Sequence, residues 1–224
     1  MNLFKQLARR HGAQARSRGH ILRSFAHKLG LVYFGSVDQH VDEHEVIRGL
    51  TISTTHDDNH YAVGAFDGYD LSIVDRSDTI ASPQNIPTEH NWVIMQLNLQ
   101  GEQRLPHLFL MPQGDSAAPF AKFYSAFTQL KSINTLFQGE HTAEFHARYQ
   151  VLASSSHAPI IEELLNPEVT RVIAARLWPH AIEILDGKLY VYTTEASLSE
   201  TLLDSCLESA VWLAKVLDQQ PDEV

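Results

Sequence analysis

The sequence predicts an α+β protein in which a curved antiparallel sheet is covered by helices, including one near each end of the chain. Two Asp-Gly pairs, at 67–68 and 186–187, lie between stretches of alternating apolar residues, and this pattern predicts two β-hairpins. Helical apolar spacing marks the segments near the two termini. Strands and helices do not alternate as they do in a parallel α/β protein, which favours an antiparallel sheet.

The first predicted hairpin runs from His60 to Asp75. A two-residue type I′ turn requires positive φ at both central residues, which Asp-Gly tolerates, and the turn fixes the pairing of the strands. The predicted pairs on one face are Phe66 with Tyr69, Gly64 with Leu71, Ala62 with Ile73 and His60 with Asp75. We expect this face to be buried. The opposite face is more polar and is expected to be partly hydrated; its pairs are Ala65 with Asp70, Val63 with Ser72 and Tyr61 with Val74.

The chain before this hairpin is predicted to hold a helix and two short strands. Residues 1–16 form a basic arm, flexible or weakly helical, and a helix starts near Ser17. Its apolar stripe is Ile21, Leu22, Phe25, Ala26 and Leu29, and Gly30 ends it. Residues 31–34 and 46–53 are predicted strands.

The middle of the chain is predicted to alternate loops and strands. Residues 76–90 are a predicted loop, and residues 91–99 alternate as a strand. Prolines on both sides of 107–111 favour a short strand at a sheet edge. Either strand is a candidate interface. Phenylalanines at helical spacing predict a helix, or a helix and a turn, over 120–137.

The last third carries the strongest local signals. Residues 149–153 are a predicted strand, and Asn166 before Pro167 is predicted to cap a helix. The hairpin at 186–187 predicts the pairs Ile184–Leu189, Ile182–Val191, Glu183–Tyr190 and Leu185–Lys188. A capping box over 197–200 is expected to open the closing helix.

Composition bounds the class of protein. The 224 residues are 44% hydrophobic and 20% charged, which is ordinary for a globular chain. We expect one domain over 17–220, and no apolar run reaches the ~18 residues that a membrane helix needs. The single cysteine, Cys206, fits a reducing compartment, and the N-terminus lacks a signal-peptide pattern. These features predict a soluble, cytoplasmic protein.

The charge is unevenly distributed. Residues 1–36 hold seven bases and no acid, so the rest of the chain has 10 bases against 27 acids, a net charge of −17. An acidic body disfavours broad nucleic-acid binding, because phosphate contacts dominate that affinity. The basic arm remains a candidate for contact with a membrane, a nucleic acid or an acidic protein surface.

Thirteen histidines are the compositional oddity. His40 and His44 are four residues apart in an acidic stretch, and His56 and His60 have the same spacing. Together with Asp75 they are the candidate ligands for a divalent metal such as zinc, with surface or partly buried histidines as the alternative. If His60 lies opposite Asp75, the carboxylate is expected to raise the imidazole pKa.

Several segments together resemble a loosely defined group of bacterial conserved hypothetical proteins. They are LRSFAHKLGLVYFGS, VIRGL, YAVGAFDGYDLSIVD, EFHARYQVLASSSHAPIIEELLNPEV and LDGKLYVYT, spread over residues 20–215. The resemblance implies a related fold. It implies no activity for this chain.

No Walker loop, dinucleotide fingerprint or nucleophile elbow occurs in the sequence. The sequence therefore favours a non-enzymatic binding or protein-interaction module that needs no cofactor and that binds a protein partner or a second copy of itself. The alternative is a metal-dependent hydrolase that uses histidines and aspartates, Asp57 and Asp75 among them, around residues 40–75.

Overall fold

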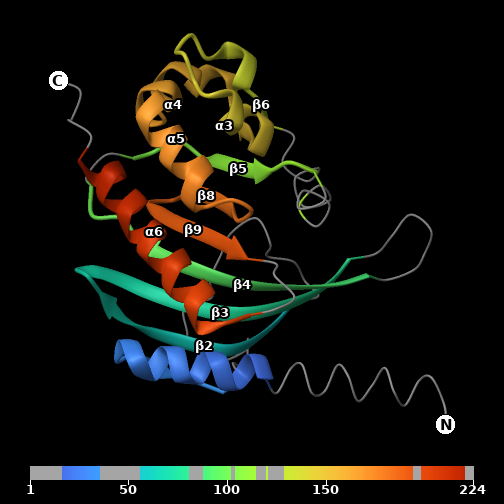
Figure 1. The fold of residues 1–224 in the computed structure, drawn as a ribbon, viewed down its shortest axis with the longest axis vertical. Helices are drawn as coiled ribbons and strands as arrows, with labels where there is room; N and C mark the ends of the chain where they lie inside the picture. The colour runs from blue at the N-terminus through green and yellow to red at the C-terminus, as the bar shows by residue number, and fades with distance from the viewer. Residues whose placement is uncertain are drawn as a thin grey trace.

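A computed structural model describes residues 17–35, 56–80, 88–101, 104–114, 120, 129–193 and 198–219. Within these residues, nine strands form one antiparallel sheet in the order β1-β2-β3-β4-β9-β8-β5-β7-β6 (Figure 1). The predicted α+β class, with a curved sheet and helices near both ends of the chain, is confirmed. The strands are β1 (Val32–Tyr33), β2 (His56–Phe66), β3 (Tyr69–Ile80), β4 (Thr88–Asn98), β5 (Leu108–Pro112), β6 (Lys131–Ser132), β7 (Tyr149–Ala153), β8 (Ala181–Leu185) and β9 (Lys188–Thr193).

Five helices of the described residues pack on one face of this sheet and share one apolar core with it. They are the N-terminal helix (17–29), α3 (Ala143–Arg148), α4 (Ala158–Leu164), α5 (Pro167–Arg176) and α6 (Glu200–Asp218). Leu22 and Phe25 of the first helix and Leu203 and Leu213 of the last belong to the same buried cluster. Figure 1 shows the N-terminal helix along β2 at one end of the molecule, with α3 and α4 at the other. None of the described helices is both long and apolar enough to span a bilayer.

Both Asp-Gly turns have the predicted conformation. Asp67 and Gly68 have φ of 50° and 89°, and Asp186 and Gly187 have 52° and 71°. All four predicted pairs of the second hairpin are present, because its turn leaves both strands regular. The first hairpin pairs as predicted from Phe66–Tyr69 back to Ala62–Ile73. Its strands are longer than predicted and extend to His56 and Ile80.

The helix boundaries follow their caps. Gly30, at φ 73°, ends the N-terminal helix, and the Asn166 side chain accepts from two backbone N–H groups of α5, as predicted. Ser199, rather than Ser197, is the observed cap of α6, and its side chain accepts from the Leu202 backbone N–H. Ser197 lies outside the described residues.

Three predictions for the middle of the chain are wrong. The expected loop at 76–90 is largely strand, because β3 and β4 pair from Leu71–Leu97 out to Ile80–Thr88. The strands expected to offer an edge or an interface are internal: β4 lies between β3 and β9, and β5 between β8 and β7. The helix expected over 120–137 does not continue through its last turns, where β6 and a 3-10 turn (Asn134–Leu136) follow instead.

The second face of the first hairpin is partly hydrated, as predicted: Ala65 and Asp70 are exposed beside the turn, and burial begins farther along the strands. Tyr61 and Val74 are 5% and 0% exposed and belong to a second apolar cluster, separate from the helical core. Aromatic side chains dominate this cluster: Trp92, Phe109, Phe120, Tyr190 and Tyr192. The strand predicted over 46–53 lies outside the described residues.

Candidate functional site

The predicted metal ligands do not converge where the structure describes them. His56 and His60 both lie in β2, with Asp75 on the neighbouring β3, and His40 and His44 lie outside the described residues. Among the described residues, no three His, Cys, Asp or Glu side chains are arranged to hold a metal ion. The metal-site hypothesis therefore stays a prediction that depends on the undescribed pair.

His60 nevertheless occupies an unusual position. It has φ of 54°, in the left-handed region that non-glycine residues rarely adopt, within a register shift between Asn59 and Ala62. The bulge turns its imidazole toward the N-terminal helix, where Gly19 leaves room for it. A Cβ at Gly19 would lie 2.5 Å from His60 Cε1. The Tyr33 hydroxyl is 2.7 Å from His60 Nδ1, and the two rings stack.

The predicted pairing of His60 with Asp75 is wrong because of this bulge. Asn59 is the residue opposite Asp75, and a pattern of alternating residues cannot reveal an inserted one. Asp75 instead accepts two hydrogen bonds from the Arg18 guanidinium, at 2.6 and 3.1 Å. This pair, with both side chains largely buried, ties the N-terminal helix to β3.

The expected rise in the His60 pKa is also wrong. Burial lowers the pKa of His60 below its usual 6.5, and the positive charges of Arg18 and Arg23 lower it further. The carboxylate of Asp75 acts in the predicted direction, but it does not outweigh burial. Near neutral pH this imidazole is therefore uncharged, and its contacts fix the helix to the edge of the sheet.

A second polar group, which sequence reasoning missed, lies on the sheet face away from the helices. Arg76 is 0% exposed, and its guanidinium donates two hydrogen bonds to the Asp58 carboxylate, at 2.7 and 2.8 Å. The paired carboxylate compensates the burial of the guanidinium. The sequence predicts a loop over 76–90, and only the strand that forms there places Arg76 on the same face as Val74.

Glu183 is a further buried charge on this face. Its side chain is 0% exposed; one carboxylate oxygen lies 2.7 Å from His107 Nε2, and the other accepts from the Tyr192 hydroxyl. Burial and the nearby carboxylate raise the pKa of Tyr192 well above 10. Phe120 packs against Tyr192 and the neighbouring Phe109, so the carboxylate lies beneath aromatic rings.

A third polar group lies within the helical layer, where the Thr170 hydroxyl contacts His141. The Thr170 hydroxyl lies 3.2 Å from the carbonyl oxygens of Asn166 and Pro167, and 3.0 Å from His141 Nδ1. A hydroxyl that donates to a carbonyl accepts from Nδ1–H, so His141 Nε2 carries the lone pair. Burial lowers the pKa of His141, and the neighbouring His146 lowers it further.

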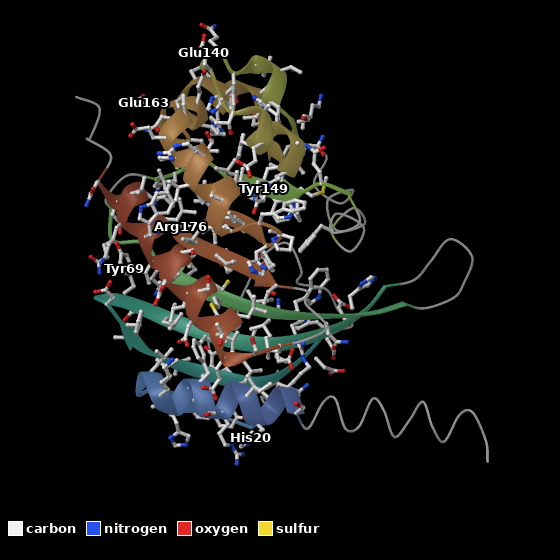
Figure 2. All side chains as sticks on the ribbon, in the orientation of Figure 1. His20, Tyr69, Glu140, Tyr149, Glu163 and Arg176 are labelled. Carbon is white, nitrogen blue, oxygen red and sulfur yellow. The ribbon has the colours of Figure 1, made fainter. Side chains whose placement is uncertain are left out.

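Figure 2 shows that Glu140, which directly precedes His141, and Glu163 of α4 point outward from the helical layer. Glu162 instead accepts backbone N–H groups of Gln138 and Gly139. The Glu162 carboxylate therefore contacts the loop before α3 and packs against Gly139.

Comparison with known proteins bears on the fold. No protein-family model matches the chain, and no curated protein matches it in sequence. The structure is similar to the crystal structure of the mycobacterial trehalose monomycolate transport factor A, with a TM-score of 0.59 and 11% sequence identity. The match covers 92% of this chain and 97% of that one. At this identity the similarity establishes that the two proteins share a fold over nearly their whole lengths.

Proposed function

We propose that the protein is a non-catalytic binding module that acts by contacting another macromolecule or a second copy of itself. The observation that carries this proposal is the pairing of three buried charged groups among the described residues. Arg76 binds Asp58, Arg18 binds Asp75, and Glu183 binds His107 and Tyr192. Loss of one partner from any of these pairs would leave an uncompensated charge in the interior, so the pairs serve the packing of the sheet and its helical cover.

Two buried groups that could act as nucleophiles, a thiol and a phenol, support the same conclusion. Nucleophilic catalysis by a thiol or a phenol requires a lowered pKa, because the ionised form reacts. Burial instead raises the pKa of the Cys206 thiol to about 12 and moves the pKa of Tyr192 upward as well. Both groups therefore stay protonated and contribute packing.

The shared fold adds support of a different kind. The mycobacterial protein is described as a trehalose monomycolate transport factor. A binding role for this chain is consistent with that description. The ligand of the mycobacterial protein is not carried over, because the two chains are 11% identical.

Native mass spectrometry of protein isolated gently from its own cells tests this proposal. We expect a complex of defined stoichiometry, either with a partner protein or as a multiple of the 25.2 kDa chain. The matched variant is Glu183→Gln, which should lower the unfolding midpoint and leave the complex intact. Turnover of any substrate that is abolished by Glu183→Gln or His60→Gln in a folded protein would contradict a non-catalytic role.

A further inference from the structure

At one end of the sheet, the last strand is shorter than the strand it pairs with. β7 pairs with β5 along the whole of Tyr149–Ala153. In the described part of the chain, β6 pairs with the final two residues of β7, Leu152 and Ala153, and is the last strand in the sheet order (Figure 1). The side of residues 149–151 that faces away from β5, here called the outer edge of β7, therefore extends beyond the β6 ladder.

The residues just after β6 bind the backbone groups of this outer edge. The Ile133 N–H donates to the Val151 carbonyl oxygen at 2.9 Å, as in a regular ladder. Asn134 Oδ1 accepts from the Val151 N–H at 2.7 Å, and Asn134 Nδ2 donates to the Tyr149 carbonyl oxygen at 3.2 Å. One carboxamide thus supplies both an acceptor and a donor, which are the two groups that a neighbouring strand would present.

The side chain of Asn134 is needed because the backbone leaves the sheet at this point. A 3-10 turn spans Asn134–Leu136, and the Leu136 N–H donates to the Ile133 carbonyl oxygen at 2.9 Å. In a regular antiparallel pair that carbonyl oxygen would accept from the Val151 N–H. The Asn134 carboxamide takes its place, and the Ser132 hydroxyl lies 3.4 Å from the same Oδ1.

The strand behind this carboxamide has the composition of a segment that pairs readily. Residues 149–153, YQVLA, contain no charged residue, no proline and no glycine. Uncharged segments of high β-propensity associate edge to edge when their backbone groups are open. Leu136, which is 47% exposed, adds apolar surface two residues after Asn134. An open edge here would therefore recruit another strand, and a second copy of the chain carries an identical one.

The Val151 N–H depends on Asn134 more than the Tyr149 carbonyl oxygen does. The Gln113 side chain also donates to the Tyr149 carbonyl oxygen, at 3.1 Å, so this oxygen keeps a donor if Asn134 is changed. The Val151 N–H donates to Asn134 Oδ1. Hydrogen exchange at the Val151 amide therefore reports whether the outer edge of β7 is closed.

We propose that Asn134 closes the outer edge of β7 against pairing with the same edge of a second copy of the chain. Loss of the carboxamide leaves an amide donor without its acceptor, and pairing with another strand restores that hydrogen bond. This goes beyond the proposed binding function, because it restricts any complex between copies to other surfaces and assigns that restriction to one side chain.

Sedimentation velocity and hydrogen exchange of the full-length chain together test the proposal. The test variant is Asn134→Ala. Asn134→Asp keeps an acceptor for the Val151 N–H and adds a negative charge that repels a second copy. Gln138→Ala is the matched control, because it removes an exposed carboxamide four residues away. Circular dichroism establishes that the variants fold, and Asn134→Ser, whose side chain is shorter, replaces the alanine variant if that variant does not fold.

At low protein concentration we expect exchange at the Val151 amide to accelerate about fivefold in Asn134→Ala. As the concentration rises, this variant should associate more than the parent chain and regain protection at Val151. Asn134→Asp and Gln138→Ala should match the parent chain in both measurements.

Two results would overturn the proposal. One is an Asn134→Ala variant that associates no more than the parent chain at any concentration. The other is association without renewed protection at Val151, which would place the contact between copies elsewhere. Both would leave the proposed function intact, because native mass spectrometry measures the complex of the parent chain separately.

Discussion

At the scale of single residues, the junction between the N-terminal helix and the sheet depends on a strained histidine. His60 has positive φ, stacks on Tyr33 and lies against the backbone of Gly19. Positive φ in a non-glycine residue is unfavourable, so surrounding contacts must hold it in place. The hydrogen bond from Tyr33 and the Arg18–Asp75 pair supply those contacts.

The lowered pKa of His60 predicts that acid loosens the N-terminal helix. The folded state disfavours the imidazolium, so the stabilisation is present above the unfolded pKa of 6.5 and is lost as pH falls below it. We expect hydrogen exchange of the amides over 17–29 to accelerate between pH 7 and pH 5, after correction for intrinsic rates. The groups that face the ring are Arg18 and Arg23 on the helix, Tyr33 on β1 and Asp75 on β3.

Three variants make this prediction specific. His60→Gln should remove the extra acceleration, and Gly19→Ala should do the same because the added Cβ displaces the imidazole. His20→Gln is the control, since it alters an exposed histidine of the same helix. An unchanged pH dependence in His60→Gln would show that another group controls the docking of the helix.

The same residues show what a sequence pattern cannot reveal. Alternation predicted every pair of the first hairpin as far as Ala62–Ile73 and failed at the next pair, because a bulge has no reliable sequence mark. Gly30 at the end of the N-terminal helix and the two Asp-Gly turns are local signals, and the sequence predicts their positions correctly. The contacts of Gly19 with His60 and of Arg18 with Asp75 join residues 41 and 57 positions apart, so only the folded chain shows them.

At the scale of elements, terminal contacts decide how α6 meets the sheet. Asp218 ends this helix, although a carboxylate at a helix C-terminus is unfavourable by about 0.3–1 kcal/mol. Its oxygens accept from the Tyr69 hydroxyl and from the backbone N–H groups of Gln100 and Gly101, at 2.8–2.9 Å. Figure 2 shows Tyr69 at the β3 end nearest to this helix terminus. The carboxylate therefore joins α6, the first hairpin and the segment after β4.

We expect Asp218→Ala to destabilise the protein by about 1–2 kcal/mol in urea unfolding, because three donors lose their acceptor. The sign is informative, since the helix dipole alone would make the substitution stabilising. Glu208→Ala, at an exposed position of the same helix, should change stability by less than about 0.5 kcal/mol. A stabilised Asp218→Ala variant would show that these hydrogen bonds contribute less than the dipole.

The sequence predicts correctly those elements whose caps or turns lie in their own residues. It does not predict elements whose conformation depends on the neighbouring strand in the sheet. The caps and hairpin turns of the last third specify their own boundaries, as at Asn166 and Asp186. The polar run 76–80 forms strand because β4 supplies its partner, and Arg76 is tolerated there because Asp58 lies opposite. The prolines around β5 predict an edge strand. Pro112, however, is the last residue of β5, so the backbone N–H groups before it still pair with the neighbouring strands.

At the scale of the whole molecule, two opposing effects act as pH falls. The net charge of −10 at pH 7 is reduced toward the isoelectric point near 5.6, which relieves repulsion between surface carboxylates. Buried histidines act the other way. Burial lowers the pKa of His180 from 6.5 to about 4, and His60 and His141 are lowered as well. The unfolded chain therefore takes up more protons than the folded one at these sites.

We expect the histidines to dominate in 0.15 M salt, because exposed charges are screened over about 8 Å whereas buried groups are not. The stabilisation from His180 is present above pH 6.5 and is lost progressively toward pH 4, by up to about 3 kcal/mol. Urea unfolding from pH 7.5 to 4.5 should therefore show falling stability, with a shallower slope in His180→Gln and an unchanged slope in the exposed control His20→Gln. A free energy of unfolding that rises toward pH 5.6 would instead show that carboxylate repulsion dominates the pH dependence. The stability of His180→Gln would then change with pH as steeply as that of the parent chain.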